Sequence, residues 1–103
     1  MISTITPRVL LLSLQRALLG RVHPQLRQAS IRADGPGQIV HVRFEYDGHP
    51  SDMVRSSCSS AAADVIADFA GPWDLDAQHV SIPAPSGLSP LAHVAYRRAE
   101  HGN

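Results

Sequence analysis

Apolar and polar residues alternate with two different periods along this chain, and each change of period marks an expected element. From Pro7 to Leu19, after a Thr6-Pro7 start, apolar residues return every three or four positions, which is typical of an amphipathic helix. In "QASIRAD" and "IVHVRFEYDG" they return at every second position, as in strands with one buried face. The turn chemistry of "DGPG", residues 34–37, between these stretches favours an antiparallel hairpin.

A second helix is expected after Ser51, whose hydroxyl suits a helix N-cap, and it should end at "AGPW". Its apolar stripe is Val54, Cys58, Ala61, Val65 and Phe69. Two further strands are expected, over 78–82 with Val80 and Ile82 facing inward, and over 91–98 with Ala92, Val94 and Tyr96 facing inward.

This α-β-β-α-β-β order predicts one α+β domain over residues 1–103. We expect a single four-stranded antiparallel sheet with both helices packed on one face. The other face should then be open to solvent. Its expected polar residues are Gln28, Ser30, Arg32, His41, Arg43, Glu45, His79, Ser81, His93 and Arg97.

Composition fits an ordinary globular domain, with 44% hydrophobic and 17% charged residues. Cys58 is the sole cysteine, so no internal disulfide can form. The apolar run from Val9 to Leu14 is too short for a membrane span, and it lacks a basic region before it and a cleavage site after it. We therefore expect a cytoplasmic protein with no membrane contact.

Charge is divided unevenly along the chain, although the net charge is zero. Residues 1–46 have a balance of +4 and residues 47–90 a balance of −5, and every basic side chain other than histidine is arginine. Zero net charge argues against a dedicated nucleic-acid binder. A separate acidic segment favours a basic partner.

The histidines and arginines of the expected open face suggest RNA binding or ribonuclease chemistry as one interpretation. RNA-binding sheets, however, stack bases on exposed aromatic residues, and here Phe44 and Tyr46 share the core-facing side of the strand. A solvated face is the simpler interpretation, so we expect no catalytic residue. No metal-ligand or cofactor motif is present, and Cys58 lies on an apolar stripe as a packed thiol. We therefore expect neither metal nor cofactor.

The acidic segment is the strongest candidate for a binding site. Asp64 and Asp68 are four residues apart on one face of the second helix, and Asp74 and Asp76 follow it. Trp73 lies between these acids and could anchor an interface, or it could cover the core. A merely soluble surface remains the alternative. The predicted partner-binding residues are Asp64, Asp68, Trp73, Asp74 and Asp76.

The stretches "LQRALLGRVHPQLRQASI", "VRFEYDGHPS", "AADVIADF" and "VAYRR" resemble small bacterial immunity proteins of toxin–immunity pairs, including those of contact-dependent growth inhibition systems. The resemblance implies a non-enzymatic, cytoplasmic protein that binds and neutralises a cognate toxin domain, often a nuclease. Such proteins carry several glutamates early in the second helix, whereas this chain has "SDMVRSSCSSAAAD". Any partner surface on that helix is therefore expected to have shifted, and the resemblance does not identify the cognate toxin.

Two alternatives stay open at this point. One is a small RNA-binding or nuclease protein that uses the histidines and arginines of the open face. The other is a homodimer formed through an exposed sheet edge. For an immunity protein, the expected state is a monomer or a weak homodimer without direct nucleic-acid contact.

Overall fold

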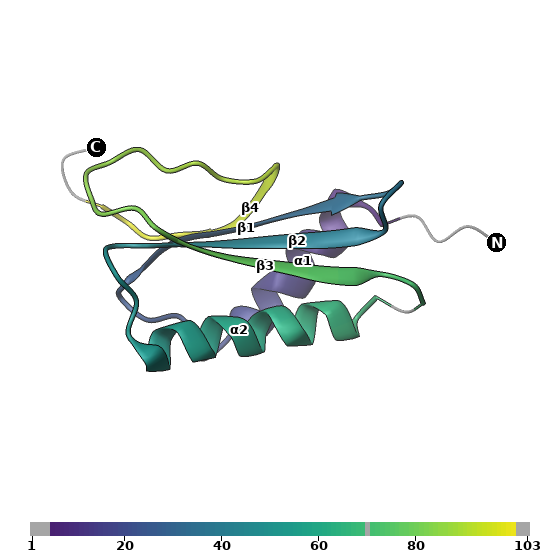
Figure 1. The fold of residues 1–103 in the computed structure, drawn as a ribbon, viewed down its shortest axis with the longest axis horizontal. Coiled ribbons are helices and arrows are strands. Elements are labelled where there is room, and N and C mark those ends of the chain that lie inside the picture. Colours follow the sequence, from purple (N-terminus) through teal and green to yellow (C-terminus); the bar gives the residue numbers. More distant parts are fainter. Residues whose placement is uncertain (1–4, 70, 101–103) are drawn as a thin grey trace.

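The structure is a computed structural model that describes residues 5–69 and 71–100, and its element order is the one expected. The helices are α1 (Pro7–Leu18) and α2 (Asp52–Ala67), and the strands are β1 (Leu26–Asp34), β2 (Ile39–Tyr46), β3 (Asp74–Ser81) and β4 (His93–Arg97) (Figure 1).

Both helices begin at the predicted caps. The Thr6 hydroxyl accepts a hydrogen bond from the Val9 amide at 3.2 Å, and the Ser51 hydroxyl accepts one from the Val54 amide at the same distance. Pro7 occupies the first turn of α1, where its missing N–H costs nothing. Local chemistry therefore accounts for both helix starts.

The sheet is mixed, so the prediction of a purely antiparallel sheet is wrong. The strand order is β3-β2-β1-β4, and β1 pairs antiparallel with β2 and β4, whereas β2 and β3 are parallel. The reason is the length of α2. Its 16 residues span about 24 Å, close to the length of β2, so the helix returns the chain to the end of the sheet where β2 began. The strand that follows must then run parallel to β2.

One hydrophobic cluster joins the helices to the sheet. Residues of both α1 and α2 contribute to this cluster together with residues of the strands. Phe44 and Val65 are fully buried there, whereas Phe69 is only partly buried. The buried apolar residues are Leu10, Leu14, Ala17, Leu18, Leu26, Ala29, Ile31, Val40, Val42, Phe44, Tyr46, Val54, Cys58, Ala61, Ala62 and Val65.

The predicted facing of β3 is wrong by one residue. Phe44 pairs with His79 and Glu45 with Val80, which places His79 on the helix side of the sheet and Val80 on the other. The His79 ring stacks on Phe44 with centroids 5.4 Å apart. The strand begins at Asp74, four residues earlier than expected. The prediction took Val80 and every second residue from it as inward-facing, and this assigned the wrong set of alternate residues to the inner face.

The facing of β4 is also only partly as predicted. Tyr96 pairs with Ala29 and points to the helix side, but the register shifts before Ser30 pairs with Val94. This irregularity turns Val94 to the outer face, where 42% of it is exposed.

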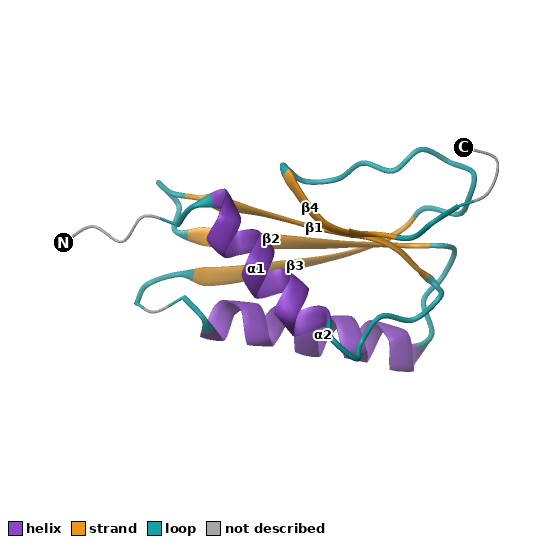
Figure 2. Ribbon diagram, turned by 180° about the vertical axis from the view of Figure 1, so that it is seen from behind, coloured by secondary structure: helices purple, strands orange, loops and turns teal. Residues whose placement is uncertain are grey.

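The outer face is not open along its whole length. Because β3 and β4 run in the same direction at opposite edges, residues 82–92 must cross the sheet to connect them (Figure 2). This segment, the crossing loop, passes over β1 and β2 on the side away from the helices. Gln28, Ser30 and Glu45 are buried beneath it, so the expectation that they would face solvent is wrong.

Candidate functional site

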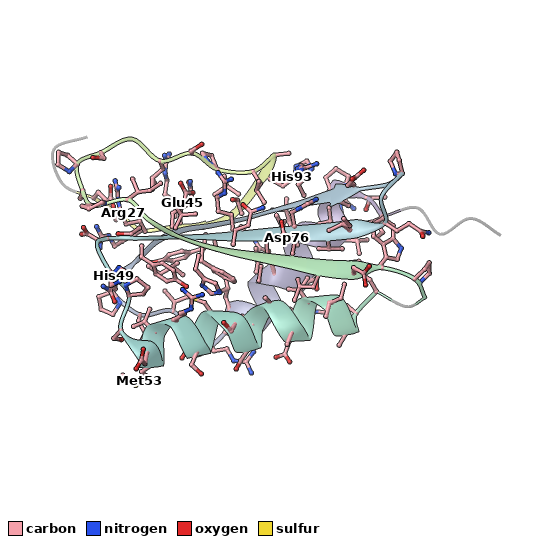
Figure 3. All side chains as sticks on the ribbon, in the orientation of Figure 1. Arg27, Glu45, His49, Met53, Asp76 and His93 are labelled. Carbon is pink, nitrogen blue, oxygen red and sulfur yellow. The ribbon has the colours of Figure 1, made fainter. Side chains whose placement is uncertain are left out.

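The covered half of the outer face is a hydrogen-bonded contact between sheet and loop. The Glu45 carboxylate accepts from the Gln28 side-chain amide at 2.9 Å and from the Ser89 backbone amide at 2.6 Å. The Ser30 hydroxyl accepts from the Leu91 amide at 2.9 Å. Figure 3 shows Arg27 and Glu45 between the sheet and the crossing loop. These polar groups serve the fold, because their hydrogen bonds hold the loop in place.

Arg27 joins the crossing loop to the chain's last described residue. It lies at a register shift in β1, is 3% exposed, and donates to the carbonyls of Ile82 and Ser86 at 2.7 and 2.9 Å. Its other nitrogens bind the Glu100 carboxylate at 2.7 and 2.8 Å, and Arg98 reaches the same carboxylate at 2.9 Å. The hydrogen bond from Arg27 is the main reason why the pKa of Glu100 falls to about 2.

The uncovered half of the outer face carries a group of acids. Asp34, Ile39 and Asp74 form one row across β1, β2 and β3, and Arg32, His41 and Asp76 form the next. We call Asp34, Asp74 and Asp76 the acidic end. Asp74 is exposed, and no ion pair to it is found within residues 5–69 and 71–100.

Asp76 is held in place by its neighbours. Its carboxylate accepts from the Gln78 side-chain amide at 2.8 Å and lies 2.7 Å from Nδ1 of His41. These hydrogen bonds, that of Gln78 first, lower the pKa of Asp76, so the group stays ionised well below neutral pH. Its side chain is nevertheless 44% exposed and can contact a partner.

Asp64 and Asp68 lie elsewhere, in a groove between α1 and α2. Asp64 is paired with Arg21. Asp68 accepts from the Ser13 hydroxyl at 2.6 Å and lies 3.7 Å from an Arg16 nitrogen. Basic side chains from the N-terminal part of the chain therefore offset both negative charges.

The structure thus divides the predicted binding residues. Asp74 and Asp76 share the outer face, Asp64 and Asp68 belong to the helix layer, and Trp73 is partly buried against the core. Sequence reasoning missed Asp34, which it had assigned only to the hairpin turn. The cross-strand register that brings Asp34 level with Asp74 follows from the parallel pairing of β3, which the local pattern did not predict.

A serine–histidine contact lies between α2 and β3, but it lacks the parts of a nucleophilic site. Nε2 of His79 is 3.2 Å from the Ser59 hydroxyl, and its Nδ1 is 2.6 Å from the Tyr46 hydroxyl. Burial lowers the pKa of His79 and raises that of Tyr46. Ser59 sits inside α2, where backbone amides already donate within the helix and cannot form an oxyanion hole. The His79 ring instead gives the buried Tyr46 hydroxyl a hydrogen-bond partner on one side and contacts the exposed Ser59 on the other.

The described part of the chain also shows no site for a reactive thiol or for a metal ion. Burial raises the pKa of the Cys58 thiol, which disfavours the reactive thiolate. Among residues 5–69 and 71–100, no three histidine, cysteine, aspartate or glutamate side chains are grouped as metal ligands would be. Neither described helix has the length and apolar character that a bilayer crossing requires.

Comparison with known protein families identifies the family of this chain. The model of the family described as "MafI2 immunity protein" matches residues 7–100, which is nearly the whole chain. No curated protein matches the sequence.

Proposed function

Because the chain belongs to the MafI2 immunity protein family, whose members act against a toxin, we propose that it does so by binding the toxin domain directly, without catalysis. The contacts of His79 and Cys58 support a non-catalytic role, because neither side chain has the surroundings of a nucleophilic site among residues 5–69 and 71–100. Inhibition by occupancy needs only a stable complex, and a domain of this size offers enough surface for one.

The proposed toxin is a nuclease delivered between bacterial cells by a contact-dependent growth inhibition system. The observation that carries this proposal is the acidic end. Asp74 has no ion pair within residues 5–69 and 71–100, and Asp76 is paired with His41, whereas arginines pair with Asp64 and Asp68. A nuclease presents a basic groove to its nucleic acid, and an acidic surface both attracts and blocks such a groove.

Trp73 extends the proposed contact, because it precedes Asp74 in the chain and is only partly buried. A partly exposed aromatic side chain next to charged residues is the usual composition of an interface anchor. The complex would form in the cytoplasm, where a nuclease reaches its substrate.

An RNA-binding or ribonuclease role has less support. Phe44 is fully buried on the helix side, and the crossing loop covers half of the outer face. Phe44 and Tyr46, the two aromatic residues that would stack bases, are therefore turned away from the polar face.

The test is the rate of association with a catalytically inactivated cognate toxin domain, which should be sought first among the genes that neighbour this one. We expect Asp74→Asn with Asp76→Asn to slow association about tenfold or more at low salt, because electrostatic steering raises such rates by about 10–10³-fold. The difference should shrink at about 0.5 M salt, where charges are screened over a few ångströms.

The matched control is Asp64→Asn with Asp68→Asn, which removes the same formal charge from the arginine-paired acids. It should slow association much less. If the two double variants behave alike, the acidic end is not the contact. If the wild-type protein does not bind the toxin at all, direct inhibition is wrong.

A further inference from the structure

β3 leaves the backbone groups along one of its sides without a strand to pair with. It is an edge strand, and its only neighbour among the described strands is β2 (Figure 1). The Asp74 amide donates to the Gln38 carbonyl beside β2 at 2.9 Å, so the even-numbered residues of β3 direct their backbone groups to β2. The odd-numbered residues direct theirs away from the sheet, and they are Leu75, Ala77, His79 and Ser81.

This edge has little of the protection that edge strands usually have. Native edges are kept from pairing with other chains by short strands, bulges, proline or charged side chains. β3 has eight residues, contains no proline and pairs with β2 without a register shift. β4, at the other edge, has five residues, and its pairing with β1 is irregular. Of the two edges, β3 is therefore the one that can accept a further strand.

α2 leaves the edge of β3 accessible. Ala77 lies on the helix side of the sheet, level with the buried Val42, but is itself exposed. Ser59, the α2 residue that contacts His79, is exposed as well. The helix therefore presents a small side chain next to the strand, and this leaves space for an added backbone.

The acids of β3 restrict which strand can pair there. Asp74 and Asp76 both lie on the outer face. In an added strand, the side chains opposite them on that face would lie about 5 Å away, a separation at which like charges repel and opposite charges attract. An acidic strand is thus disfavoured and a strand with basic side chains is favoured.

A second copy of this chain fits the edge less well. The β3 strand of a second copy has no arginine or lysine to place opposite Asp74 and Asp76. Its β4 would bring Arg97, but a contact between β3 and β4 is not symmetric and would repeat from molecule to molecule into rings or filaments. The strand that fits belongs to a different, basic protein.

We propose that an extended segment of the toxin adds a strand to the edge of β3, with basic side chains opposite Asp74 and Asp76. This inference rests on the proposed function and states how the acidic end engages its partner. Main-chain hydrogen bonds to the outward-facing residues would supply affinity, and the two acids would select a basic strand. A basic segment held in this way is no longer free to contact nucleic acid.

The experiment measures the dissociation constant for a catalytically inactivated cognate toxin domain. Ala77→Pro removes one outward N–H and places the proline ring where the added strand would lie. Proline is tolerated on an edge strand when the missing N–H faces solvent, so the melting temperature should stay close to that of wild type. Binding should weaken by about tenfold or more.

The matched comparison is Ala77→Val, which adds a side chain of similar size but keeps the N–H. It should bind the toxin domain much more tightly than Ala77→Pro. If the two variants bind equally tightly, the toxin does not pair with this edge, although direct inhibition still stands.

Hydrogen exchange gives a second measurement that requires no substitution. In the free protein, the outward amides of β3 should exchange faster than the amides that β2 protects. Binding of the toxin domain should slow the exchange of the outward amides, because each gains a hydrogen-bond partner. If they exchange as fast in the complex as in the free protein, no strand has been added and the inference is wrong.

Two other results would also overturn the inference. If wild type is a dimer by sedimentation, and Ala77→Pro makes it monomeric without changing toxin affinity, the edge belongs to a second copy. Failure of wild type to bind the toxin domain would instead reject the proposed function, and this inference with it.

Discussion

At the residue scale, the polar side chains of this protein divide into those that hold the fold and those that remain available. Ser30 and Glu45 were expected on a face open to solvent, because alternation tells which side of a strand a residue faces and not what covers that side. Their burial depends on a loop that lies about 40 to 60 residues away along the chain. For the same reason, the local sequence pattern did not predict the arginine partners of Asp64 and Asp68, which are distant along the chain.

Glu100→Gln should make stability depend less on pH. The folded pKa of Glu100 is lowered from 4.5 to about 2, so the fold favours the ionised form. Its stabilising contribution is fully present above about pH 4.5 and is lost as pH falls toward 2. Urea unfolding midpoints of wild type and variant should therefore differ at neutral pH and converge as the pH approaches 2. A difference that stays constant down to that pH would contradict the Arg27–Glu100 pairing.

At the scale of elements, local signals predicted the helices and the hairpin, and long-range geometry decided the rest. Caps at Thr6 and Ser51 and the turn at 34–37 act within a few residues, so the sequence displays them. The direction of β3 depends on where α2 returns the chain, and its facing depends on its partner β2. The pattern of apolar residues over 78–82 indicates neither the direction of β3 nor which of its residues face inward.

Two phenylalanines test the packing between these elements. Phe44 is fully buried between β2 and α2, so Phe44→Ala should lower the free energy of unfolding by about 3–5 kcal/mol. Phe69, just after α2, is only partly buried, and Phe69→Ala should cost clearly less. Chemical denaturation measures both. Equal losses would mean that the end of α2 packs more tightly than the structure indicates.

At the scale of the whole molecule, folding redistributes the charge that the sequence separates. Arg16 and Arg21 from the basic part of the chain meet Asp68 and Asp64 from the acidic part, and Arg98 meets Asp47. What remains on the outer face is the acidic end, Asp34, Asp74 and Asp76. Pairing within the fold therefore decides which of the predicted binding residues keep a charge that acts on a partner at a distance.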